Sequence, residues 1–437
     1  MDTNLSKLLD KVLDVDFGII RFIKEAPLSA DEPDIFIAVT EFQNPFVIAS
    51  PENRENYSME RKSAGAALDR ETAIWSAVGE GIERYAGAIY DHESIIWEKS
   101  ENLEKGAYVD PKDFILFSNE QYSTSSFRYN AHDPKIQIGW TEVKALEDDK
   151  NVLLPATLAY FAYKNENKAE YITDSYSTGL ACGPTKEWAI CGGLYEVIER
   201  DAYSLHWAGK IPAKIISIEK AIQNASPELK KLLEFEGVDL FIGDITTDIG
   251  IPTILTIARQ QGKPGIALGA STHLCPKKAL EKAVIECFHT LNWCQEMRHH
   301  PTAINEVDVK QFADHVKYYM NKENEDKAAF FWSGNEESKM FDNNSKELEV
   351  PVGHEKQSKH IIKELSKLGH PSYLVNNTPD DVKELGLFVT KAIVPSLQPM
   401  WCGYGRVPLD RRRFEQFLKH KKININTPIN TNIHPFP

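Results

Sequence analysis

Two segments of the chain carry a pair of glutamates three residues apart, and an arginine follows each pair directly. These residues are Glu80, Glu83 and Arg84 in the first segment and Glu196, Glu199 and Arg200 in the second. Side chains at this spacing project from one face of a helix, so the carboxylates of a pair can share one cation. Magnesium and calcium prefer such oxygen ligands and can hold a polyanion in turn. A single pair of this kind is more often a solvated helix face with a local salt bridge.

The recurrence of the pattern favours a site over a solvated face. In both segments a Glu-x-Ala sequence stands at the same distance before the pair. A Ser-x-Gly sequence, which we expect to form a turn, precedes each at Ser63 and Ser177. A third, partial copy has Glu286 at the matching position, Lys282 before it and His289 in place of the second glutamate. We therefore expect three helices whose carboxylates converge on one cavity.

The apolar periodicity predicts long helices for all three copies. Their expected ranges are 69–90, 186–207 and about 276–297. Thr185 suits the N-cap of the second helix, because its hydroxyl can accept a backbone N–H of the first turn.

Strands alternate with shorter helices elsewhere, which predicts an α+β fold with mixed sheets. Strands are expected at 18–23, 34–39, 238–242, 253–259, 372–375 and 388–394, and helices at 361–368 and 380–385. The stretch 300–360 is the most polar part of the chain, and within it we expect loop or flexible structure at 321–326 and 333–346. The tail, 423–437, is rich in Asn and Pro and is a poor candidate for a helix.

Composition excludes several classes of protein. The 437 residues carry a net charge of −14 and are 42% hydrophobic, which indicates a globular chain and argues against broad binding to nucleic acid or anionic membranes. The six cysteines form no Cys-x-x-Cys pair, so a zinc site or a disulfide framework is not expected. No signal peptide or membrane-spanning run is visible, and we expect a cytoplasmic protein. Neither a dinucleotide-binding glycine motif nor a P-loop occurs.

Three long stretches resemble the YcaO superfamily. They are SAGAALDRETAIWSAVGEGIERYAG, STGLACGPTKEWAICGGLYEVIERDAYSLHW and KAIVPSLQPMWCGYG. They are most similar to its thiazole- and oxazole-forming cyclodehydratases, in particular the stand-alone D proteins of the streptolysin-type branch. The resemblance implies a YcaO-like fold with the glutamate-bearing helices around a central ATP site. Residues 1–60 would pack on a catalytic domain of residues 61–437, with a polar insertion near 300–360 and a Pro-rich tail.

The resemblance also implies roles for individual residues. ATP and Mg2+ are the expected cofactors. Glu80, Glu83, Glu196 and Glu199 would face the magnesium, and Ser76, Ser177, Arg200 and Lys282 would contact the nucleotide. The carboxylate of Pro437 would be the general base, carried into the site by the stiff Pro-Phe-Pro end of the chain. A disordered tail is the alternative, and it is the usual fate of such a terminus.

In the reaction that the family catalyses, a Cys, Ser or Thr side chain of a precursor peptide attacks the preceding carbonyl. ATP then phosphorylates the former amide oxygen, and loss of phosphate leaves an azoline ring, as in bacteriocin biosynthesis. Because the chain has no recognisable leader-binding or E1-like module, we expect a separate partner protein to present the peptide. The family allows a flavin dehydrogenase in the same complex and suggests a homodimer.

Three alternatives stay open from the sequence. A YcaO enzyme can form another backbone modification, a thioamide or an amidine. A YcaO-like scaffold can bind peptide without turnover, which departures from the family pattern at Pro184 and Trp188 would suit. A di-iron carboxylate protein is suggested by Glu286 and His289 as a Glu-x-x-His pair, but that fold needs two such helices in a bundle.

Overall fold

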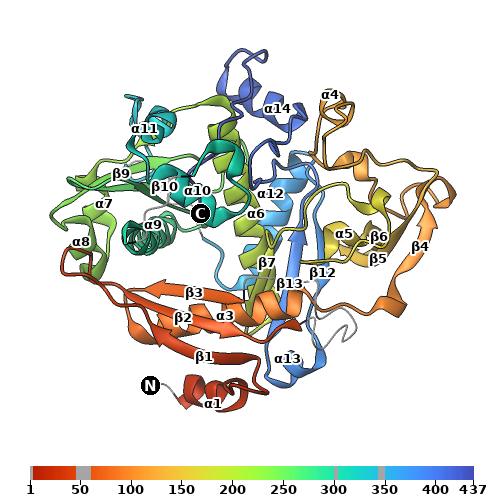
Figure 1. Ribbon diagram of the computed structural model, residues 1–437, viewed down its shortest axis with the longest axis horizontal. Coiled ribbons are helices and arrows are strands. Elements are labelled where there is room, and N and C mark those ends of the chain that lie inside the picture. Colours follow the sequence, from red (N-terminus) through yellow and green to blue (C-terminus); the bar gives the residue numbers. More distant parts are fainter. Residues whose placement is uncertain (1–2, 46–60, 300–303, 343–349) are drawn as a thin grey trace.

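The computed structural model describes residues 3–45, 61–299, 304–342 and 350–437, and these residues form three antiparallel sheets. One long helix packs against each sheet: α3 on the first, α9 on the second and α6 on the third. Figure 1 shows these helices meeting near the centre of the molecule, with the sheets arranged around them. The predicted α+β class is confirmed. No helix in the described ranges is long and apolar enough to cross a bilayer.

The first sheet has the order β1-β2-β3 and is covered by α3. Its elements are β1 (Ile20–Glu25), β2 (Phe36–Phe42), β3 (Lys62–Ala67) and α3 (Arg70–Gly87), with α1 (Thr3–Val12) alongside. Asp69 caps α3 by accepting the backbone N–H of Thr72. The turn expected at Ser63 is wrong, because this segment is strand β3. Gly65 lets the strand cross the helix closely: a Cβ there would lie 2.3 Å from the backbone nitrogen of Ala77.

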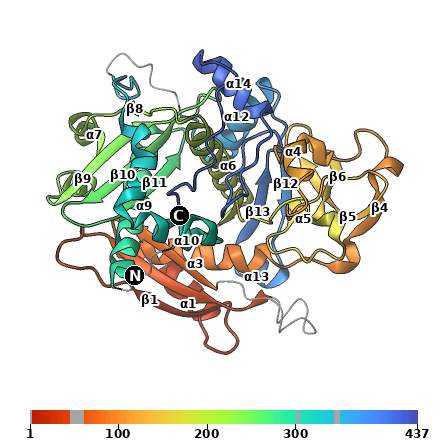
Figure 2. The same cartoon turned by 45° about the horizontal axis from the view of Figure 1, so that its top comes forward.

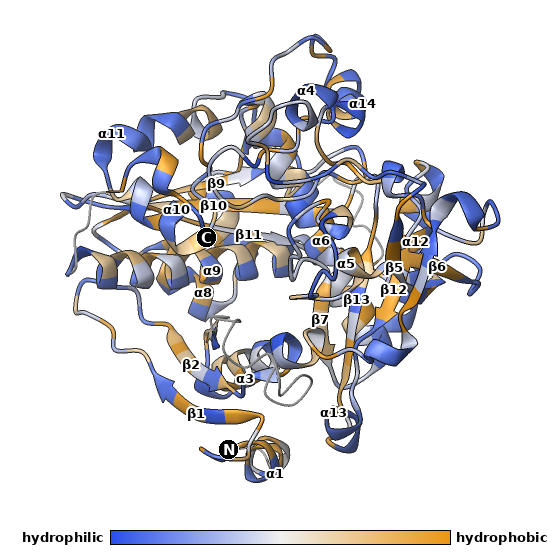
Figure 3. Cartoon of the chain, turned by 45° about the vertical axis from the view of Figure 1, so that its right-hand side comes forward, coloured by the Kyte–Doolittle hydropathy of each residue, from blue (hydrophilic) through white to orange (hydrophobic). Residues whose placement is uncertain are grey.

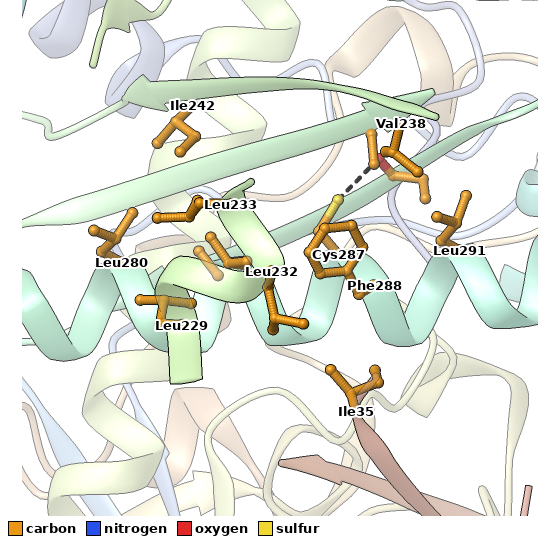
Figure 4. Close-up of a cluster of buried hydrophobic side chains, with 14 of the residues drawn as sticks. Ile35, Leu229, Leu232, Leu233, Val238, Ile242, Leu280, Cys287, Phe288 and Leu291 are labelled. Carbon is orange, nitrogen blue, oxygen red and sulfur yellow. Dashed lines mark hydrogen bonds between the residues drawn. The ribbon is translucent and has the colours of Figure 1, made fainter. Parts of the chain in front are cut away.

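The second sheet has the order β11-β10-β9-β8 and packs on α9. Its elements are β8 (Lys214–Ile215), β9 (Val238–Asp244), β10 (Thr253–Gln260), β11 (Ile266–Thr272) and α9 (Pro276–Arg298). Two short helices, α7 (Ile218–Asn224) and α8 (Pro227–Leu233), complete this layer. Figure 4 shows Leu280, Phe288 and Leu291 of α9 packing with Leu232 and Leu233 of α8 in a buried cluster.

The third sheet has the order β4-β5-β12-β13-β7, and β6 pairs with β5. Its strands are β4 (Ile96–Lys99), β5 (Gln137–Ala145), β6 (Asn151–Pro155), β7 (Leu180–Gly183), β12 (Tyr373–Asn376) and β13 (Phe388–Ile393). The helices around it are α5 (Ala156–Ala159), α6 (Lys186–Gly209), α12 (His354–Lys367) and α13 (Asp380–Glu384). Apolar residues run along β12 and β13 in Figure 3. Helix α6 is buried along most of its length, between this sheet, α12 and β11.

The later segments close the fold around α6. They are α10 (Phe312–Tyr319), α11 (Lys322–Glu325), a 3-10 segment (Asp326–Trp332) and α14 (Arg412–Lys421), with α4 (Asn119–Tyr122) nearby. The loop expected at 321–326 is therefore partly helical, and the part of 333–346 beyond residue 342 lies outside the described residues. The tail after α14 is not helical, as predicted, but Ile433 and Phe436 are buried. Figures 1 and 2 both place the C-terminal end in the middle of the molecule, next to α10.

Candidate functional site

Helices α3, α6 and α9 border one large cavity of about 2120 Å3. Every site residue expected from the sequence lines it: Ser76, Glu80, Glu83, Ser177, Glu196, Glu199, Arg200, Lys282 and Pro437. The structure thus brings together residues that are far apart in the chain. Their roles as ligands and as a base stay predictions.

The first glutamate of each copy is held by the backbone segment that precedes its helix, a strand residue in the first and third copies and the turn residue before β7 in the second. Its Oε2 atom accepts a backbone N–H at nearly the same distance in all three copies. The pairs are Glu80 with Ala64 (3.0 Å), Glu196 with Gly179 (2.9 Å) and Glu286 with Ala270 (3.0 Å). Each close strand–helix crossing is made possible by glycine. A Cβ at Gly269 would lie 2.2 Å from the backbone nitrogen of Cys287, much as at Gly65.

The second glutamate reaches across to the strand of the next copy. Glu199 Oε2 accepts the backbone N–H of Thr272 in β11 (3.3 Å), and Glu83 lies close to the backbone N–H of Cys182 in β7. Helix α9 in turn packs against β3, so the contacts between copies close into a ring. His289 lies at the corresponding position of α9 and also faces the cavity. The three helices are therefore joined in a ring, in which Glu199 supplies the hydrogen bond between α6 and β11.

Arginines compensate part of this negative charge. Arg84 Nη2 lies 2.6 Å from Glu80 Oε1, and the attraction of Glu80 raises the pKa of Arg84. Arg200 pairs with Glu196 at 3.5 Å and with Glu199 at 3.4 Å. The pair with Glu199 is made by the buried Nη1 atom of Arg200, which is close to the carboxylate but has no hydrogen bond among the described residues. A phosphate oxygen would satisfy this N–H, since guanidinium groups bind phosphate well.

Several of the buried carboxyl groups have raised pKa values, because ionising them away from water costs free energy. Burial raises the pKa of Glu83 well above its usual range, and the nearby Glu196 and Glu80 raise it further. Burial also raises the pKa of Glu199, and it raises that of Glu286 to about 7. A divalent cation among these groups would favour their ionised form. The acidic cavity therefore suits a cation.

The donor set fits magnesium shared with a polyphosphate better than a cage made by protein alone. Within the described residues, no three Asp, Glu, His or Cys side chains are grouped to hold one metal ion. Mg2+ usually keeps several waters and is bound through one or two carboxylates together with substrate phosphates. The oxygen ligands available here, on α3, α6 and α9, match that pattern, and Arg84, Arg200 and Lys282 could face the phosphates.

A family model matches residues 64–398 of the chain. Its description is that of a YcaO cyclodehydratase domain that binds ATP and Mg2+. The chain belongs to the YcaO family. An uncharacterized protein of Methanothermobacter thermautotrophicus is 27% identical over 226 residues, 51% of this chain and 55% of that protein. An uncharacterized protein from the tfuA 3' region of Rhizobium leguminosarum bv. trifolii is 24% identical over 286 residues, 62% of this chain and 61% of that protein. The chain thus spans less than two thirds of either relative.

Solved structures share the YcaO fold at low sequence identity. A heterocyclase in complex with substrate and cofactor superposes with a TM-score of 0.78 at 19% identity, covering 99% of this chain and 57% of that one. YcaO from Methanopyrus kandleri, bound with AMPPCP and Mg2+, has a TM-score of 0.62 at 16% identity, with coverage of 90% and 88%. The E. coli microcin synthetase McbBCD complex with pro-MccB17 bound has a TM-score of 0.62 at 15% identity, and the match covers 95% of this chain and 96% of that one.

Sequence reasoning expected the third helix to face the cavity but did not assign Glu286 to the candidate site. Glu286 lines the cavity and accepts a backbone N–H in the same way as Glu80 and Glu196. The signal was present, because Glu286 aligns with both in the repeat. The family resemblance placed only Glu80, Glu83, Glu196 and Glu199 on the magnesium side, so Glu286 received no role there. The structure also argues against a di-iron carboxylate protein. Helix α9 packs on a sheet, and the described residues contain no second Glu-x-x-His helix facing it.

Proposed function

We propose that this chain is an ATP-dependent cyclodehydratase that converts Cys, Ser or Thr residues of a ribosomally made precursor peptide to azolines. The observation that supports this most is the convergence of three glutamate-bearing helices, with two arginines, on one cavity in a chain of the YcaO cyclodehydratase family. Carboxylates alone repel a triphosphate, so such a site is useful for nucleotide chemistry only together with divalent cations.

The proposed reaction has two chemical stages. The side-chain oxygen or sulfur of the peptide first adds to the preceding carbonyl carbon and gives up its proton. The former amide oxygen then attacks the γ-phosphorus of ATP, and ADP leaves. The amide nitrogen loses its proton, the carbon–oxygen bond breaks, and phosphate departs as the ring gains a C=N bond. Mg2+, held between glutamates and phosphates, would neutralise charge during phosphoryl transfer.

Individual residues take distinct parts in this proposal. Glu80, Glu83, Glu196, Glu199 and Glu286 face the metal side. Arg200 and Lys282 bind phosphate oxygens, and Ser76 and Ser177 make polar contacts with the nucleotide. The carboxylate of Pro437 takes the peptide's proton. An α-carboxyl has an ordinary pKa of about 3.3–3.7 and is therefore ionised at neutral pH. The position of Pro437 supports this role, because Pro437 lines the same cavity as the glutamates.

We further propose that a separate protein presents the precursor peptide. A leader-binding, E1-like partner would raise the rate of ATP use, and a flavin dehydrogenase could join the complex to oxidise azolines. The McbBCD complex, a structural neighbour, has a peptide bound in an assembly of several proteins. We expect the isolated chain to have weak activity. Its activity should be strong when a partner encoded by a neighbouring gene is present.

The test measures nucleotide binding first and turnover second. Calorimetry with MgATP should show binding by the purified chain, which Glu196→Gln abolishes and Glu187→Gln, on the same helix but outside the cavity lining, leaves in place. Mixed with the neighbouring-gene proteins and peptide, the chain should release ADP and phosphate as the peptide loses one water per ring. Binding without hydrolysis would indicate a scaffold. Exchange of oxygen for sulfur, or ring closure by an amine, would indicate thioamide or amidine chemistry.

A further inference from the structure

The last residues of the chain are held through their backbone by side chains from distant elements. Three consecutive carbonyl groups, those of Asn432, Ile433 and His434, each accept a hydrogen bond. The donors are Trp207 Nε1 of α6 (3.2 Å), the Tyr319 hydroxyl (2.6 Å) and His315 Nδ1 (2.8 Å), the last two on α10. Because the donors contact carbonyl groups, they fix the path of the backbone whatever side chains the tail carries.

His315 also connects the tail to the loop before α14. Its Nε2 atom accepts the backbone N–H of Gly403 (2.9 Å), so Nδ1 carries the proton that is donated to His434. Burial lowers the pKa of His315 to about 4, which keeps this neutral form at physiological pH. His434 Nε2 donates to the carbonyl of Trp401 (2.7 Å) in the same loop. Loop, helix and tail are thus joined by one chain of hydrogen bonds.

Helix α10 belongs to the cavity wall as well as to this anchor. Its first residue, Phe312, lines the cavity together with Gln311 and Pro437, while His315 and Tyr319 lie one and two turns further along and hold the tail. Both are buried, His315 and Tyr319 each having an exposed fraction of 0%. Their hydrogen-bonding groups therefore act on the tail and are not available to ligands in the cavity.

We propose that His315 and Tyr319 are positioning residues that set the place of the Pro437 carboxylate in the cavity. The proposal rests on the proposed function, in which that carboxylate takes a proton from the peptide. A chain held at two successive carbonyls, with only three residues after the second anchor, leaves the terminal group little freedom. Proline at 435 and 437 reduces that freedom further. Loss of either donor should let the carboxylate move, while the backbone hydrogen bonds that hold Glu80, Glu196 and Glu286 stay in place.

The first test asks whether the donors hold the tail. Tyr319→Phe removes one oxygen atom, and His315→Ala removes the imidazole. Tyr318→Phe is the matched control, because this neighbouring hydroxyl contacts Glu306 and Lys327 and not the tail. Hydrogen exchange by mass spectrometry should show at least tenfold faster exchange of the amides of residues 432, 433, 434 and 436 in the first two variants and no change in the control. Unchanged exchange in a folded Tyr319→Phe protein would overturn the anchoring.

The second test separates positioning from general stability. In the complex with partner and peptide, Tyr319→Phe should lower kcat for ring formation at least tenfold while the Kd for MgATP stays within twofold. A fall in MgATP affinity equal to the fall in kcat would assign the residue a structural role and refute the proposal, as would a wild-type kcat. If the wild-type complex forms no rings, the proposed function fails, and the exchange experiment still decides the anchoring. If His315→Ala does not fold, the decision rests on Tyr319→Phe.

Discussion

The guanidinium carbon of Arg200 lies 4.4 Å from the centre of the Phe436 ring, while its nitrogens pair with Glu196 and Glu199. One side chain thereby contacts the acidic group that we assign to magnesium and the segment that carries Pro437. A cation over an aromatic face is favourable by about 2 kcal/mol or more when both groups are desolvated. Arg200 should therefore keep the tail close to the nucleotide side of the cavity.

We expect Glu286→Gln to lower ATP turnover by at least about 100-fold, as much as Glu196→Gln. The amide oxygen can still accept the N–H of Ala270, so folding is retained while the charge is lost. Steady-state ADP release measures the effect, and circular dichroism verifies the fold. Glu187→Gln, on α6 and outside the cavity lining, is the control and should keep most of the activity. Wild-type turnover by Glu286→Gln would exclude Glu286 from the metal site.

The helices and their repeated glutamates could be predicted because their signals are local. The N-caps Asp69 and Thr185 and the apolar stripes lie within a few residues of the helices that they specify. The path of the tail has no such signal. The donors to its carbonyls lie 114 residues or more away in sequence, at Tyr319, His315 and Trp207. Only the folded chain brings these groups together.

Glycine misled the sequence reading at one point. Ser63 and Gly65 are typical turn residues, yet they lie in β3. Here glycine is needed for the close crossing with α3 and not for a turn, and single-sequence patterns do not distinguish these two uses. The close crossing lets the backbone N–H of Ala64 donate to Glu80. The sequence pattern therefore also failed to predict this hydrogen bond of the site.

Gly65→Ala should lower the free energy of unfolding by roughly 3 kcal/mol, the upper end of overpacking costs. The new Cβ would lie 2.3 Å from the nitrogen of Ala77 and 2.5 Å from the carbonyl oxygen of Ala73, and neither backbone atom can move without bending α3. A Cβ at Gly79, which lies within α3 itself, would meet no atom within 4 Å. Gly79→Ala should therefore raise the free energy of unfolding by about 0.5–1 kcal/mol. Urea unfolding of both variants measures this contrast. Equal stability of the two would show that β3 and α3 are not in close contact.

We expect His206→Gln to reduce the loss of stability in mild acid. Burial lowers the pKa of His206 to about 3, whereas its unfolded value is about 6.5. The folded state thus keeps this group neutral, and its contribution to stability is present above about pH 6.5 and lost as the pH falls toward 3. Between pH 7.5 and pH 5 the wild-type protein should lose about 2 kcal/mol more than the variant. Urea unfolding at both pH values measures the difference, and equal losses would contradict it.

Adding a few residues after Pro437 should cripple ring formation and leave MgATP binding largely in place. The extension displaces the carboxylate that we assign as base, but the carbonyls of Ile433 and His434 can keep their bonds to Tyr319 and His315. The loss of a general base is expected to cost about 100-fold to 10,000-fold in rate. Single-turnover ring formation and MgATP calorimetry, made on the same preparation, separate the two effects. An extended protein with unchanged hydrogen exchange at 432–436 and wild-type ring formation would rule out the terminal carboxylate. The base would then have to be sought among the other groups that face the cavity, of which His289 is the first to test.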